Sequence, residues 1–342
     1  MKRNSIFYLV VLLCIAIALV LSVVLGAVKI PVRTVFSILW AQVPGVNIDP
    51  SWSVAFESIL LRVRLPHTVL LALTGAALAG SGAAYQGLFR NPLADPYLIG
   101  VASGAGLGAV IALSFPAMNS NFGLYLIPVA AFFGAVVTVL LVYNLARVNG
   151  FVPLTTLILA GVAVGSFTSA LTSFVMLQSK EQVVRALSFL LGGSPVSGWE
   201  PVLAVLPYML IGLGLLAISG HPLNVLQFGE DQARQMGLKV NRAKIFIIVV
   251  ASMTTAAAVS FSGVIGFVGL VVPHLFRLIW GADYRHLIPL SMLGGVSVLL
   301  FADILARILI APQSLPVGII TSLAGAPFFL WILRRAKREV FW

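Results

Sequence analysis

Residues 245–276, IFIIVVASMTTAAAVSFSGVIGFVGLVVPHLF, form a stretch of 32 residues without Lys, Arg, Asp or Glu. A helix that crosses a lipid bilayer needs about 20 apolar residues, so this stretch could hold one long helix or two short ones. Gly263, Gly266 and Gly269 can break the backbone between two short helices. The choice decides the fold, because it decides on which side of a membrane the C-terminus lies.

The composition places the chain among polytopic membrane proteins built from helices. Hydrophobic residues make up 60% of the sequence and charged residues only 9%, whereas soluble domains contain about 25% charged residues. We attribute the net charge of +11 to basic residues that orient membrane spans, and we expect no nucleic-acid partner. The single cysteine, Cys14, excludes an intrachain disulfide and a cysteine-based metal cluster.

Other charge-free stretches predict the remaining spans. The N-terminal run 4–28 is long enough to cross a membrane, so we expect it to be retained rather than cleaved as a signal peptide. The run 96–146 is interrupted at 115–123, FPAMNSNFG, which is rich in turn residues, and it therefore predicts two spans. The other charge-free runs are 65–89, 148–179, 201–229, 286–302 and 308–333.

The distribution of basic residues selects two helices in 245–276. With Lys2 and Arg3 inside, a single helix there gives nine spans and leaves the basic C-terminal cluster outside, against the positive-inside rule. Two helices give about ten spans with both termini in the cytoplasm. Of the 21 Lys and Arg residues, those then outside are Lys29, Arg33, Arg62, Arg64, Lys180, Arg185 and Arg307. We therefore predict an all-α protein with about ten transmembrane helices, forming one domain over residues 1–342.

The sequence also contains a weak internal echo, which predicts an inverted repeat of the kind found in transporters. The alternative is coincidence among small residues that pack helices closely. At an offset of 181 positions, Thr74, Ala76, Ala77, Ser81, Gly82, Pro92 and Gly100 recur as Thr255, Ala257, Ala258, Ser262, Gly263, Pro273 and Gly281.

A polar island at 223–244, LNVLQFGEDQARQMGLKVNRAK, interrupts the apolar sequence. Gly229 and Gly237 bracket it, and Glu230 and Arg234 have the i,i+4 spacing of helix neighbours. A short cytoplasmic helix held between two spans is what a transporter needs if a soluble motor drives it. The alternative is an ordinary solvated loop.

The chain has no G-x-x-x-x-G-K-[ST] loop with which to bind ATP itself. Nearly all of its ten acidic residues lie in loops or at span ends, which favours a partner ATPase over proton coupling within the membrane. No Ser/His/Asp or paired-carboxylate constellation occurs, so we expect no enzyme activity and no cofactor. A gradient-driven secondary transporter is the rival from another class.

Several long segments resemble the FecCD permeases of type II ABC importers, which move iron-siderophores, haem and cobalamin. The segments are LPHTVLLALTGAALAGSGAAYQGLFRNPLADPYLIGVASGAGLGA (65–109), LNVLQFGEDQARQMGL (223–238), GVIGFVGLVVPHLFRLIWGADYRHLIPLSMLGG (263–295) and ADILARILIAPQSLPVGIITSLAGAPFFLWIL (302–333). The resemblance implies ten helices per subunit, a homodimer, two copies of a separate ABC ATPase and a substrate-binding protein. It also implies a bacterial or archaeal cytoplasmic (inner) membrane and, as first choice of cargo, an iron chelate such as a ferric siderophore or haem. Cobalamin is the alternative within the family.

The same resemblance assigns roles to single residues. It implies an ATPase coupling segment with Gly229, Glu230, Ala233, Arg234 and Gly237. It places Asn91, Leu93, Thr155 and Thr156 at the gate of the translocation path. The alternative for Thr155 is simple helix capping.

The outer cations are the other group with an implied role. Arg64 and Arg307 match positions that pair with glutamates of the binding protein, whereas His67 stands where arginine is commoner. Snorkelling to lipid headgroups is the alternative. Arg185 could meet an anionic cargo group. His221, His274 and His286 have no ligand spacing, so we expect no metal site.

Overall fold

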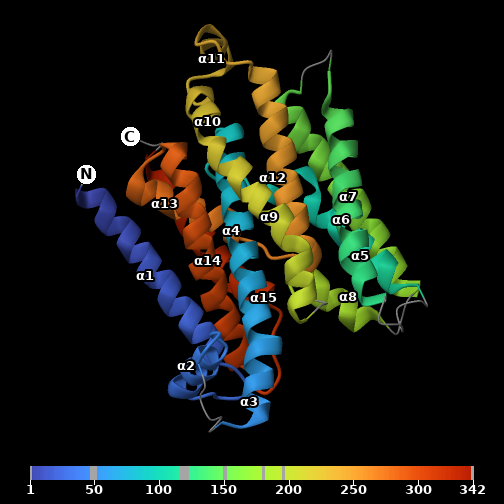
Figure 1. Ribbon diagram of the computed structural model, residues 1–342. Helices are drawn as coiled ribbons and strands as arrows, with labels where there is room; N and C mark the ends of the chain where they lie inside the picture. Colours follow the sequence, from blue (N-terminus) through green and yellow to red (C-terminus); the bar gives the residue numbers. More distant parts are fainter. Residues whose placement is uncertain are drawn as a thin grey trace.

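The computed structural model describes residues 2–46, 52–115, 123–148, 152–178, 182–194 and 197–339. The described residues form a bundle of helices joined by loops, with no β-strand among them (Figure 1). The long helices are α1 (Lys2–Val24), α4 (Leu65–Leu88), α6 (Gly123–Ala146), α7 (Leu154–Gln178), α9 (Trp199–Ile218), α12 (Val240–Ser262), α14 (Tyr284–Ile308) and α15 (Val317–Glu339). The shorter ones are α2 (Val32–Ala41), α3 (Val54–Ser58), η1 (Ile59–Arg64), η2 (Pro96–Ile99), α5 (Val101–Leu113), α8 (Val183–Leu190), α10 (Gly220–Leu226), α11 (Glu230–Gln235) and α13 (Val268–Trp280).

The helices confirm an all-α polytopic membrane protein. Among the described residues, seven helical segments are long and apolar enough to cross a membrane, and they include α1, α4, α6, α7, α9, α12 and α14. The shorter apolar helices α5 and α13 and the apolar part of α15, Val317–Ile332, lie where the other three spans were expected. Each expected span therefore corresponds to one helix.

The deciding stretch 245–276 is divided as the sequence predicts. A non-helical segment over 263–267 separates α12 from α13. Gly263 has a φ of +78°, a conformation that side chains with a Cβ rarely adopt, and a Cβ there would lie 2.6 Å from the Phe189 carbonyl oxygen. Gly269, which the sequence analysis placed in the break, instead lies inside α13.

Helix α4 is the centre of the bundle and is buried over most of its length. It packs against α14, α12, α13 and α9. A Cβ on Gly75 would lie 2.3 Å from the Gly295 carbonyl oxygen, and a Cβ on Gly82 would lie 1.8 Å from that of Gly269. Glycine at these positions lets the helix backbones approach closely, as small residues do in membrane bundles.

The two ends of the bundle differ (Figure 1). One end carries α11, and both ends of the chain lie toward it; we call it the α11 end. The opposite end carries α2, α3 and α8, and we call it the α2 end. Two termini at the same end are consistent with an even number of crossings, and the side of the membrane that each end faces stays a prediction.

The two copies of the internal sequence echo have corresponding structures only in part. Its first residues lie in α4 and their counterparts lie in α12, and these two helices pack against each other. Beyond them the copies diverge, since Pro92 lies in the loop after α4 whereas Pro273 lies inside α13. Gly100 and Gly281 both have positive φ, +84° and +106°. An inverted repeat stays a prediction for the α4–α12 pair.

Candidate functional sites at the two ends of the bundle

The central part of the polar island forms the short helix α11, which lies at one end of the bundle, apart from its core (Figure 1). Gly229 begins it with a φ of +103° and Gly237 ends it with a φ of +85°. At the C-terminus the Leu238 N–H donates to the Ala233 carbonyl at 3.0 Å, and the Gly237 N–H donates to the Arg234 carbonyl at 3.0 Å. This pair of bonds is a Schellman cap, and it requires the left-handed backbone that glycine supplies. Ala233 is fully buried, so it anchors the helix on the inward face.

Glu230 contacts two cations, and the nearer one was not expected. The predicted i,i+4 pair with Arg234 is present, but its nitrogen and oxygen lie 3.8 Å apart. The Lys244 ammonium lies only 2.8 Å from the Glu230 carboxylate, and it also donates to the Val152 carbonyl at 3.1 Å. Lys244 is 6% exposed. The ion pair between Glu230 and Lys244 thus links α11 to α12. The exposed i,i+4 pair between Glu230 and Arg234 contributes less to stability.

The expected gate residues lie toward the α11 end, in the loop after α4 and in the first turn of α7. Asn91 accepts a hydrogen bond from the Leu93 N–H at 2.9 Å, which fixes the turn between the two residues. Thr155 is exposed and Thr156 half-buried. Because α7 begins at Leu154, Thr155 lies within the helix, and the alternative of helix capping does not fit its position.

The same loop carries Asp95, which caps η2. Its carboxylate accepts a hydrogen bond from the Tyr97 N–H at 2.8 Å. Burial raises the pKa of Asp95 to about 6, although this hydrogen bond acts in the opposite direction. Close to this carboxyl, η2 packs against α7, so the loop and α7 are in contact next to the expected gate.

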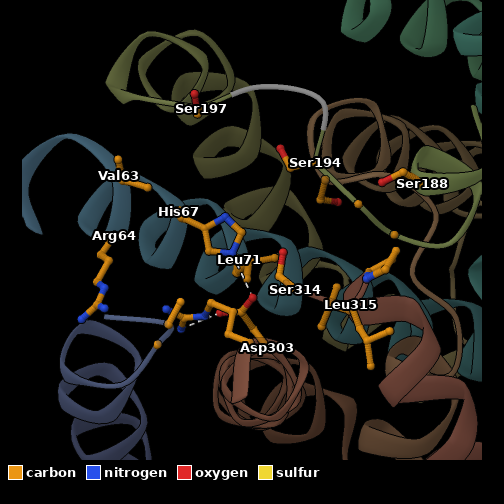
Figure 2. Close-up of a pocket in the computed structure, with 18 of the residues that line it drawn as sticks. Val63, Arg64, His67, Leu71, Ser188, Ser194, Ser197, Asp303, Ser314 and Leu315 are labelled. Atoms are coloured by element: carbon orange, nitrogen blue, oxygen red, sulfur yellow. Dashed lines mark hydrogen bonds and ion pairs between the residues drawn. The ribbon is translucent and has the colours of Figure 1, made fainter. Parts of the chain in front are cut away.

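A cavity of about 490 Å³ opens at the α2 end, between η1, α4, α14 and the segment that follows α8 (Figure 2). Four serine residues line it, Ser188, Ser194 and Ser197 on one side and Ser314 nearer to Asp303. His67 projects toward Asp303 on the opposite wall. The sequence analysis did not foresee this cavity, because its wall comes from five separate segments.

Arg64 is not the exposed charge that the sequence analysis expected. It is 6% exposed, and its guanidinium donates to the carbonyls of Val23 and Val24 at 2.9 Å and also to that of Val28. The Val23 and Val24 carbonyls lie at the C-terminus of α1, where helix carbonyls lack intrahelical partners and a cation is favoured, and Val28 lies in the segment that follows. Arg64 therefore fixes the end of α1 against η1.

Arg307 and His67 share one carboxylate, that of Asp303. The Arg307 guanidinium lies 2.7 Å from Asp303, and the His67 Nε2 lies 2.9 Å from its other oxygen. Asp303 and Arg307 are four residues apart on α14, the spacing that brings two side chains together on one helix face. Arg307 also donates to the Ser22 carbonyl at 3.0 Å and to the Leu25 carbonyl at 3.1 Å. Of these side chains, His67 is the most accessible, with 33% exposed.

The remaining candidates are separate from these sites. Arg185 is exposed on α8 and does not line the cavity. His286 forms a hydrogen bond with the Tyr8 hydroxyl at 3.2 Å, and His274 is buried in α13. Within the described part of the chain, no three His, Cys, Asp or Glu residues gather as metal ligands would.

Comparison with known proteins identifies the relatives of this chain. Residues 13–335 match the model of the FecCD transport family. The chain is 43% identical over 327 residues to the uncharacterized ABC transporter permease protein YvrB of Bacillus subtilis (strain 168), covering 94% of this chain and 92% of that protein. It is 38% identical to the hemin transport system permease protein HmuU of Yersinia pestis, covering 97% and 96%. It is 46% identical to the cobalamin import system permease protein BtuC of Halobacterium salinarum, covering 83% and 75%.

A solved structure extends the likeness to the fold. It shows a transporter assigned to the metal-chelate type of ABC transporters in an inward-facing conformation. The TM-score is 0.79 at 31% sequence identity, and the alignment covers 95% of this chain and 97% of that one. The helical bundle described above is therefore the fold of an ABC permease.

Proposed function

Because the chain belongs to the FecCD transport family, we propose that it is the membrane-spanning permease subunit of an ATP-driven importer for an iron chelate, a ferric siderophore or haem. Family membership over residues 13–335 carries this proposal. The relatives are named for haem and for cobalamin, so cobalamin is the alternative cargo. The permease has no phosphate-binding loop, and hydrolysis of ATP belongs to a partner chain.

The partners follow from the two ends of the bundle. Two copies of an ABC ATPase bind the α11 ends of a permease homodimer, with Gly229, Glu230, Ala233, Arg234 and Gly237 forming the contact or holding its shape. A substrate-binding protein delivers cargo at the α2 end, near His67. This arrangement places the α11 end and both termini in the cytoplasm of a bacterial or archaeal cell, with lipid around the apolar helices of the inner membrane.

The transport cycle is one of alternating access. ATP-driven closure of the motor pair moves α11, and the movement opens or closes the path at Asn91, Leu93, Thr155 and Thr156. Of the described acidic residues, Asp303 is the least exposed and is paired with Arg307 and His67, and the partly buried Asp95 caps η2. A proton-driven carrier would need a carboxylate free to titrate within the membrane, so this pairing favours a motor over a gradient.

Assembly and cargo can be tested together. The permease is co-expressed with a candidate ABC ATPase and a candidate binding protein from the same genome, and native mass spectrometry measures the mass of the detergent-solubilised complex. We expect two permeases and two ATPases, joined by one binding protein. Titration of the binding protein with hemin, a ferric siderophore and cyanocobalamin then identifies the cargo. A permease that purifies without any ATPase and transports along an ion gradient would contradict the proposal.

A further inference from the structure

We propose that Lys244 is a positioning residue that couples the movement of α11 to the start of α7. The inference rests on the proposed function, in which α11 receives the motor and α7 carries part of the gate. Lys244 is the last residue of the polar island, and the sequence assigned it no individual role.

The ammonium of Lys244 has two partners from different elements. Its Nζ lies 2.8 Å from the Glu230 carboxylate on α11 and donates to the Val152 carbonyl at 3.1 Å. Val152 directly precedes the first turn of α7, where the Pro153 carbonyl accepts from the Leu157 N–H at 3.0 Å. Lys244 itself belongs to α12, so one nitrogen joins three elements.

The burial of Lys244 makes this junction stiff. A buried charge must stay paired, because losing a partner leaves an ion without solvation. Lys244 is 6% exposed. If α11 moved while Val152 stayed in place, the ammonium would lose one of its two partners. Movement of α11 is therefore expected to carry Lys244, and with it the backbone that leads into α7.

Packing offers no equally direct route between the two elements. Helix α11 packs against α10 and α12, whereas α7 packs against α5, α6, α8 and η2. Helix α12 in turn packs chiefly against α4, α9 and α6. The Lys244 junction thus joins α11 to the start of α7 through one side chain, whereas the route through helix packing runs from α11 through α12 and α6 to α7.

The test uses a reporter cysteine, Thr156→Cys, in a Cys14→Ala background, with the permease bound to its ATPase in lipid nanodiscs. The labelling rate of the cysteine by a maleimide is measured with and without ATP and vanadate. In the parent we expect this rate to change about tenfold with nucleotide, within the usual range of coupling between sites. In Lys244→Met the change should nearly vanish, while the ATPase still binds and hydrolyses ATP. Arg147→Met removes an exposed positive charge at the same end and should behave as the parent does.

A charge exchange separates coupling from simple attachment of α11. In Lys244→Glu combined with Glu230→Lys the pair between α11 and α12 is kept, but a carboxylate at position 244 cannot donate to the Val152 carbonyl. We expect this variant to lose the nucleotide response at position 156, and the response is measured at saturating ATPase because Glu230 also belongs to the proposed ATPase contact. Lys244→Arg keeps a hydrogen-bond donor and the positive charge, so it should retain most of the nucleotide response at position 156.

The outcomes are distinguishable. A parent that binds no ATPase contradicts the proposed function itself. In a second outcome, the labelling rate of the parent, Thr156→Cys in Cys14→Ala, changes with nucleotide and that of Lys244→Met or of the charge-exchanged variant changes equally. This result overturns only the role of Lys244. A Lys244→Met variant that folds but fails to bind the ATPase also overturns it, because the residue would then hold the docking surface rather than transmit its movement.

Discussion

At the scale of single residues, charged side chains at both ends of the bundle are used mainly to fix the fold. Arg64 and Arg307 donate to carbonyls at the end of α1, and Lys244 donates to one before α7. The sequence placed these cations at span ends, but it could not show that they turn inward. The direction of each side chain depends on which helix ends lie next to each other, and local sequence patterns do not give this information. Sequence spacing can predict only the pairs at i,i+4 on one helix, which are Glu230–Arg234 and Asp303–Arg307.

Replacing Arg64 tests its structural role. Arg64→Gln leaves several carbonyls at the end of α1 without a charged donor, and we expect a loss of about 2 kcal/mol or more in the free energy of unfolding. The measurement is the midpoint of thermal unfolding in detergent. Arg185→Gln, an exposed arginine at the same end of the bundle, serves as the control and should change the midpoint little. Equal midpoints for both variants would show that Arg64 is a surface charge.

His67 tests docking of the binding protein. It is the accessible member of the group around Asp303, so His67→Arg should place a full charge at the cavity and speed association with the binding protein. The effect should be largest at low ionic strength, where charges act over longer distances. Surface plasmon resonance at two salt concentrations measures it. Association rates that are equal to those of the parent at low salt would remove His67 from the docking surface.

At the scale of elements, the charge-free runs predicted the spans, and glycine predicted where they break. The division of 245–276 follows from Gly263, whose positive φ ends α12. The sequence did not predict α2 and α8, since short helices outside the membrane have no length requirement. It also missed that the outer loops enclose a cavity, because their packing depends on residues far apart in the chain.

The glycine that ends α11 provides a test of this element. Gly237 has a φ of +85° and open space around it, so Gly237→Ala adds no clash but forces alanine into a left-handed conformation, at a cost of about 1 kcal/mol. Gly214 in α9 also has open space but lies in an ordinary helix, so Gly214→Ala is the matched control. We expect weaker ATPase binding for Gly237→Ala alone. Unchanged binding in both variants would mean that the α11 cap is not needed for the motor.

At the scale of the whole molecule, both chain ends lie toward α11, which is the arrangement expected for an even number of spans (Figure 1). The distribution of basic residues predicts that this end faces the cytoplasm. The family and the fold are shared with ABC permeases, and we propose the roles of the two ends from that kinship. Cargo identity does not follow from it, because the related permeases include one named for hemin and one named for cobalamin.

Topology is tested directly by single cysteines at residues 2 and 340 in a Cys14→Ala background. Both should be shielded from an impermeant thiol reagent in intact cells and react once the cells are opened. Labelling of one terminus alone in intact cells would require an odd number of spans and would contradict the arrangement of ten.

The central claim is that this chain imports a chelate with energy from ATP. The most direct measurement is uptake of the radiolabelled compound that the binding protein selects, into proteoliposomes that contain the permease and its ATPase, with ionophores present to abolish ion gradients. The account predicts uptake that requires ATP, the ATPase and the binding protein together, and that persists with ionophores. Uptake without the ATPase that ionophores abolish would contradict it and identify a gradient-driven carrier.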